Sequence, residues 1–130
     1  KPEWEPIAEA ALTKAKDRGV KFLIPVDSLI TDSFDFDAKK VGTTKFTAVG
    51  ESIPDGWEGV DIGPESVKLF SEEIAKAKTV LWNGPMGVFE MENFQAGTKA
   101  VALSICSTSM PSVRSRSTPC TAWQKRRSGK

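Results

Sequence analysis

The chain has 130 residues, which is enough for one domain, and 39% of them are hydrophobic, which is enough to form a core. It contains no histidine, which excludes nucleophilic catalysis by a Ser–His or Cys–His pair, and its two cysteines form no metal-binding cluster. No apolar run could cross a bilayer and the first residues are polar, so we expect a cytoplasmic protein with both cysteines reduced.

The charges of the chain are unevenly distributed. Residues 1–92 carry 11 basic and 17 acidic side chains, whereas residues 93–130 carry 7 basic side chains and no acidic ones. After about Ile105, Ser and Arg accumulate and apolar residues become rare. We therefore predict a folded part over residues 1–106. A basic, Ser- and Arg-rich tail over residues 107–130 is expected to be disordered or translated out of frame, and to be unable to complete a sheet.

The first half of the chain begins with helical periodicity. Apolar residues at spacings of three and four predict a helix over residues 6–18, which Gly19 would end. Phe22-Leu23-Ile24 predicts a buried strand. Residues 31–63 are rich in turn-forming and acidic residues, which is typical of surface loops, with a short strand over residues 45–49.

The second half alternates more regularly. A helix is predicted from Pro64 to about Lys78, with its apolar face inward, and a strand follows over residues 79–82. The loop Asn83-Gly84-Pro85-Met86-Gly87 ends that strand, and a third helix is predicted over residues 92–105. This order predicts an α/β fold with a parallel sheet covered by helices. Because ligands bind beyond the carboxyl ends of such strands, the loop is a candidate site.

Three stretches of the sequence together resemble phosphoglycerate kinase. They are Phe22-Leu23-Ile24-Pro25-Val26-Asp27, the segment from Ile53 to Ser66 (IPDGWEGVDIGPES), and Trp82-Asn83-Gly84-Pro85-Met86-Gly87-Val88-Phe89-Glu90. The third is the most specific. The resemblance covers about residues 6–106 and implies part of the C-terminal, nucleotide-binding domain. In that family, this domain is a Rossmann-like, three-layer parallel sheet with helices on both faces.

The resemblance also implies an activity. The family transfers a phosphoryl group between 1,3-bisphosphoglycerate and ADP in glycolysis, and uses Mg²⁺ with ATP or ADP. The phosphoglycerate is bound by an N-terminal domain that this chain lacks, and the family is monomeric.

The resemblance assigns nucleotide-binding roles to particular positions. Gly59 and Val60 would pack against the adenine, Glu90 would bind the ribose hydroxyls, and Asn83 would lie near the transferring phosphate. No catalytic side chain and no metal ligand is assigned. The residues implied to bind nucleotide are Gly59, Val60, Asn83, Gly84, Pro85, Met86, Val88 and Glu90.

Each of these residues has a simpler structural interpretation. Without the resemblance, Gly59 would be a turn glycine, Glu90 a solvated glutamate at the start of a helix, and the loop at Gly84 an ordinary turn. Trp57 and Trp82 are expected to be packing residues rather than ligand contacts.

The sequence departs from the family pattern in two places. A loop containing Gly-Lys would precede Lys1, and a Gly-Gly-Gly-Asp turn, which interacts with the metal nucleotide, should follow Cys106. That place instead contains Pro111-Ser112-Val113-Arg114, with no glycine between Gly97 and Gly129. The turn that supplies the aspartate is therefore missing, and we expect this chain to be an inactive fragment.

Two alternative functions remain open. One is a non-catalytic remnant that still binds nucleotide. The other is an interaction protein whose basic tail contacts nucleic acid or acidic surfaces. We favour the enzyme fragment, with neither nucleic acid nor a membrane as a partner.

Overall fold

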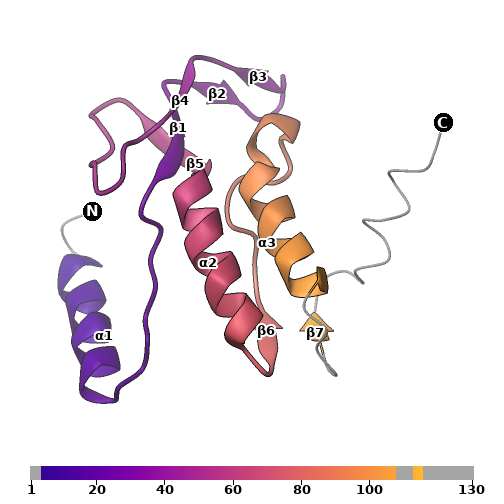
Figure 1. Ribbon diagram of the computed structural model, residues 1–130. Helices are drawn as coiled ribbons and strands as arrows, with labels where there is room; N and C mark the ends of the chain where they lie inside the picture. The colour runs from indigo at the N-terminus through magenta and orange to yellow at the C-terminus, as the bar shows by residue number, and fades with distance from the viewer. Residues whose placement is uncertain (1–3, 108–112, 116–130) are drawn as a thin grey trace.

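The chain combines three α-helices with short strands, in a computed structural model that describes residues 4–107 and 113–115 (Figure 1). The helices are α1 (Glu5–Asp17), α2 (Pro64–Lys76) and α3 (Ala96–Ser107), with a 3₁₀ turn, η2 (Glu92–Phe94). The strands are β1 (Ser28–Thr31), β2 (Phe34–Asp35), β3 (Lys40–Val41), β4 (Thr44–Phe46), β5 (Glu58–Ile62), β6 (Val80–Trp82) and β7 (Val113–Ser115). The predicted α/β class is confirmed.

The largest sheet is antiparallel. Strand β1 lies between β4 and β5 and pairs antiparallel with both, so that Leu29 faces Phe46 on one side and Asp61 on the other. The predicted parallel arrangement is wrong for these strands. The physical reason is their connectivity, because parallel neighbours need a long crossover, usually a helix, and no helix lies between β1 and β5.

A parallel pair is formed by β6 and β7, in which Val80 faces Val113. Here α3 connects the two strands and supplies the crossover that parallel pairing requires. Strand β7 lies in the segment that we predicted could not complete a sheet, and that prediction is wrong for residues 113–115. Strand pairing needs only backbone groups, so a three-residue strand does not require an apolar run. The rest of the predicted tail, residues 108–112 and 116–130, lies outside the described residues.

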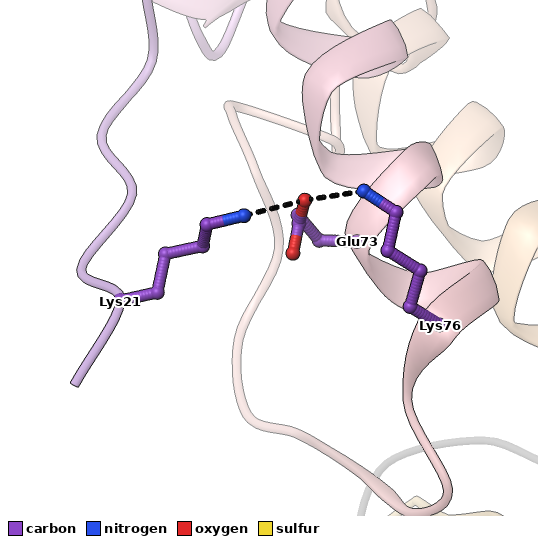
Figure 2. Close-up of polar contacts among 3 residues, drawn as sticks. All are labelled: Lys21, Glu73 and Lys76. Carbon is purple, nitrogen blue, oxygen red and sulfur yellow. Dashed lines mark hydrogen bonds and ion pairs between the residues drawn. The ribbon is translucent and has the colours of Figure 1, made fainter. Parts of the chain in front are cut away.

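The apolar run after α1 does not form the predicted strand. Residues 21–25 lead from α1 towards β1 without strand pairing (Figure 1), and Phe22 and Ile24 are 52% and 56% exposed. Figure 2 shows how this segment is tied to α2: the Nζ of Lys21 lies 2.7 Å and that of Lys76 2.8 Å from Oε1 of Glu73. Apolar residues favour a strand only where another strand can pair with them, and the described residues provide none.

Helix α1 has the predicted bounds to within a residue, but its apolar face is not buried. Pro6 occupies the first turn, where its missing N–H costs nothing, and basic residues occupy the last turn. Ile7 is nevertheless 60% exposed and no residue of α1 is buried. The helical periodicity therefore predicted the helix correctly, but it did not predict that the apolar face would stay exposed.

Two apolar clusters form the core, and β5 contributes to both. Val60 packs with Met91 and Phe94, and Ile62 packs with Val101 and Ile105 of α3. The second cluster also receives the predicted apolar face of α2, which lies beside α3 (Figure 1). The residues of α2 that pack against it are Val67, Phe70 and Ile74.

The region predicted to be mostly surface loops, residues 31–63, contains part of the core. Val60 is 1% exposed, and Ile30, just before this region, is fully buried. The expectation of loops is therefore wrong for β5. The predicted strand over residues 45–49 is found slightly earlier, as β4, and the third helix is divided into η2 and α3.

Cys106 is disulfide-bonded, so the expectation of a reduced thiol is wrong for this residue.

Within the described part of the chain, no helix is both long and apolar enough to cross a membrane.

Candidate functional site

The loop that follows β6 forms the first part of the candidate site. Asn83, Gly84 and Pro85 are exposed, directly after the last residue of the strand. Gly84 has a φ of +91°, a conformation that side chains with a Cβ rarely adopt. A glycine is thus required here by the turn itself, with or without a ligand.

Two hydrogen bonds hold this loop in place. The backbone N–H of Met86 donates to Oγ1 of Thr98 in α3 at 3.0 Å. The N–H of Val88 donates to the carbonyl oxygen of Val60 in β5 at 2.8 Å. Both acceptor residues are buried. The loop is therefore fixed to a helix on one side and to a strand on the other.

Gly87 lies where the loop passes close to β5. A Cβ at this position would be 2.4 Å from the carbonyl oxygen of Val60 and 2.6 Å from Cα of Asp61. Both are backbone atoms of a sheet, which cannot move without disturbing the pairing with β1. Only glycine fits between the loop and the strand.

Gly59 and Val60 lie on β5 and differ in what they expose. The side chain of Val60 is in the core, its carbonyl oxygen accepts the N–H of Val88, and the residue as a whole is buried. Gly59 is exposed, and a Cβ there would lie 3.1 Å from Cδ1 of Ile53, the end of a flexible side chain. The fold therefore does not strictly require glycine at position 59.

Glu90 is exposed and lines a polar hollow of about 390 Å³. Lys39 is far from Glu90 in the sequence but borders the same hollow. The other lining residues come from the segment around Glu90 itself. The lining residues are Lys39, Glu90, Met91, Glu92, Asn93 and Gln95.

Asp61 is a buried carboxylate beside the loop, and the sequence analysis did not single it out. The residue is 5% exposed; Oδ2 accepts the N–H of Gly97 at 2.7 Å and Oδ1 accepts the N–H of Ile62 at 2.9 Å. Burial raises the pKa of Asp61, and the two hydrogen bonds only partly oppose this. The feature of the sequence that could have indicated Asp61 is the position of an acidic residue between two apolar ones, Val60 and Ile62.

The structure brings together some of the predicted site residues. Val60 contacts Val88 directly, and Gly59 is next to Val60 in the same strand. Asn83, Gly84 and Pro85 lie at the exposed start of the loop, and Glu90 lines the hollow just beyond its end.

Trp57 and Trp82 have packing contacts. The Nζ of Lys45 lies 4.5 Å from the centre of the Trp57 ring, and Trp82 packs against the Ile62 cluster.

The described residues do not provide a set of ligands for a metal ion. Among residues 4–107, no three acidic or cysteine side chains lie close enough together to hold one. The magnesium that the resemblance implies therefore has no set of side-chain ligands in this part of the chain.

Comparison with protein families identifies the chain. The family model described as phosphoglycerate kinase matches residues 2–116, most of the sequence. The chain belongs to the phosphoglycerate kinase family. A phosphoglycerate kinase from Microcystis aeruginosa is 53% identical over 96 residues, which is 74% of this chain and 23% of that protein. One from Chloroherpeton thalassium is 54% identical over 99 residues, 76% of this chain and 24% of that protein.

The solved phosphoglycerate kinase from Coxiella burnetii has a similar fold. Its TM-score is 0.80 at 25% identity, and the match covers 97% of this chain and 31% of that one. The chain thus spans about a quarter of the length of the curated phosphoglycerate kinases it matches and about a third of this solved one.

Proposed function

We propose that this chain is part of the nucleotide-binding domain of a phosphoglycerate kinase and supplies part of the site for ADP and ATP. The observation that carries this proposal is the 2.8 Å hydrogen bond from Val88 N–H to the Val60 carbonyl oxygen. It joins the stretch that the family resemblance assigns to the adenine to the loop that the resemblance assigns to the ribose and phosphates. The two stretches are far apart in sequence, so their contact is what a shared ligand site requires.

Each proposed contact suits the chemistry of one part of the nucleotide. The exposed backbone at Gly59 leaves room for a flat ring to approach β5. The exposed carboxylate of Glu90 can accept hydrogen bonds from two neighbouring ribose hydroxyls. The amide of Asn83 and the exposed backbone at Gly84 would face the phosphates, in a loop whose shape Pro85, Met86 and Gly87 complete.

The proposed reaction does not need a histidine. Transfer of a phosphoryl group between ADP and the acyl phosphate of 1,3-bisphosphoglycerate depends on positioning, charge neutralisation and exclusion of water. We propose that the phosphoglycerate site and the metal-nucleotide contacts come from parts of a longer cytoplasmic, monomeric protein. On this proposal the 130-residue chain binds nucleotide weakly and does not turn over substrate.

A coupled kinase assay, combined with calorimetric titration of ADP, tests this proposal. The product of the longer gene is expected to phosphorylate 3-phosphoglycerate with ATP, and this chain alone to bind ADP without turnover. Turnover by this chain comparable to that of a complete enzyme would show that it is no fragment. ADP binding without turnover by the longer product would instead support a non-catalytic remnant. Absence of ADP binding by both would overturn the nucleotide site.

A further inference from the structure

Three elements around the candidate site hold one another in a closed network of hydrogen bonds. Strand β5 holds the loop through the Val60 carbonyl and Val88 N–H, at 2.8 Å. The loop holds α3 through Met86 N–H and Thr98 Oγ1, at 3.0 Å. Helix α3 is held to β5 through Gly97 N–H and Asp61 Oδ2, at 2.7 Å, and this third link alone uses a charged side chain.

Asp61 is placed to affect all three elements. It follows Val60 in β5 and caps the first turn of α3, where free N–H groups favour a negative charge. It also fills the space between two glycines: a Cβ at Gly87 would be 2.8 Å, and one at Gly97 2.5 Å, from Oδ1 of Asp61. Its carboxylate therefore sets the spacing between strand, loop and helix.

Burial of this carboxylate needs an explanation beyond general stability. Desolvation opposes the ionised form of Asp61, as the raised pKa indicates, and a neutral side chain would avoid that cost. The carboxylate presents one oxygen to the N–H of Gly97 and the other to the N–H of Ile62, whereas an amide of the same shape has a single acceptor oxygen. The bond to Ile62 orients the carboxylate within β5, and the bond to Gly97 joins β5 to α3, whose Thr98 holds the loop.

We propose that Asp61 is a positioning residue, which orients the loop of residues 83–90 against β5 and thereby sets the geometry of the nucleotide site. The effect on nucleotide rests on the function proposed above, whereas the effect on the loop does not. Asp61 touches no nucleotide on this proposal and acts through α3 and Gly87.

The test uses Asp61→Asn in the 130-residue chain, with Asp27→Asn as a matched control. Both aspartates are 5% exposed and both accept backbone N–H groups at the start of a helix, but the carboxylate of Asp27 accepts those of Glu65 and Ser66 in α2 and none from the loop or α3. Asparagine keeps the shape and has one accepting oxygen, so in each variant one N–H meets an NH₂ group instead. The readout is amide hydrogen exchange measured by NMR.

In Asp61→Asn, the amides of Gly97 and Val88 are expected to exchange on the order of tenfold faster than in the wild type. The amide of Val67, which donates to Gly63 within α2, should be unchanged. In Asp27→Asn, Val88 should be unchanged. If Val88 is unaffected by Asp61→Asn, or is accelerated equally in both variants, Asp61 has only a general structural role and the proposal fails.

A second variant covers the case in which Asp61→Asn does not fold. Thr98→Val removes the oxygen that accepts Met86 N–H and keeps the Asp61–Gly97 bond. It should accelerate Met86 and Val88 on the order of tenfold and leave Gly97 unchanged. An unaffected Val88 would show that the loop is not positioned through α3, which overturns the proposal.

Calorimetric titration with ADP completes the experiment. Asp61→Asn is expected to weaken ADP binding on the order of tenfold, and Asp27→Asn to leave it unchanged. If the wild-type chain does not bind ADP, the nucleotide function fails, and the exchange rates still decide whether Asp61 positions the loop. If ADP binds equally to all three proteins, the geometry that Asp61 sets does not matter for the nucleotide, and that part of the proposal fails.

Discussion

Oδ1 of Asp27 accepts the backbone N–H of Ser66 at 2.7 Å, and the two residues are 39 positions apart in the sequence. Oδ2 accepts the N–H of Glu65 at 3.0 Å. In return, Oγ of Ser66 accepts the N–H groups of Val26 and Asp27, at 2.8 and 3.0 Å. The segment that leads into β1 and the first turn of α2 thus satisfy each other's free polar groups.

Replacing Asp27 with Ala should lower the free energy of unfolding by about 1–3 kcal/mol, because buried N–H groups in the first turn of α2 lose their acceptors. Urea unfolding followed by tryptophan fluorescence measures this change. Asp35→Ala is a suitable control, since Asp35 also accepts a backbone N–H, that of Ala38 at 2.8 Å, but is exposed. An equal loss in both variants would mean that burial of the Asp27 contacts does not matter.

Asp27 should also make stability depend on pH in acid. Burial alone would raise the pKa of Asp27, but the hydrogen bonds from Ser66 and Glu65 outweigh it and lower the pKa below 3.8. Below about 3.8 the unfolded chain therefore binds more protons at this site, and the stabilisation is lost as the pH falls through the folded pKa. Unfolding curves at several pH values should show a smaller acid-dependent loss in Asp27→Asn than in the wild type.

Asp61 should act in the opposite direction. Its pKa is raised above 3.8, so above this value the folded chain binds more protons at Asp61 than the unfolded chain does. Its contribution to stability consequently decreases as the pH rises from 3.8 through the folded pKa. A difference between Asp61→Asn and wild type that does not change over this interval would contradict the raised pKa.

The two glycines of the site should respond differently to alanine. Gly87→Ala places a Cβ 2.4 Å from the backbone oxygen of Val60 and should destabilise the fold by about 1–3 kcal/mol. Gly59→Ala meets only the end of Ile53, at 3.1 Å, and should change stability little. If the proposed adenine contact is correct, Gly59→Ala should instead weaken ADP binding. Thermal unfolding and ADP titration of both variants separate the two effects, and the reverse pattern would contradict them.

Glu90→Ala should weaken ADP binding by on the order of tenfold or more, because a hydrogen bond to a charged group contributes roughly 1.5–3 kcal/mol. Glu92→Ala makes the same change of charge in the same hollow and should have little effect. Equal ADP affinities for the wild type and Glu90→Ala, measured by calorimetry, would mean that Glu90 is only a surface residue.

Local signals in the sequence predicted local structure well. Helix α2 was predicted from Pro64 at its start and from the spacing of Val67, Phe70 and Ile74. The prediction succeeded because a helix start and an apolar face are both determined by residues close together in the sequence. The loop after β6 was likewise predicted from its sequence. The resemblance to a family was needed to connect this loop with Gly59, since no local pattern indicates that Val88 will bond to Val60.

Features that depend on distant partners were not predicted. Val60 and Ile62 are core residues only because α3 and the segment around Met91 cover them. Asp61 could not be recognised as a capping residue for a helix that begins 35 positions later. Conversely, the apolar run at Phe22 met no neighbouring strand among the described residues, so its strong strand preference did not produce a strand.

The extended segment of residues 21–25 has a practical consequence for every measurement on the isolated chain. Its alternate residues Phe22 and Ile24 expose apolar surface, and among the described residues its backbone makes no hydrogen bond to other backbone groups. Extended chain of this kind pairs readily with another copy of itself. Self-association increases with protein concentration. Affinities and exchange rates therefore describe the single molecule only below the concentration at which the chain begins to associate. A dilution series, with light scattering as the readout, should therefore precede each titration.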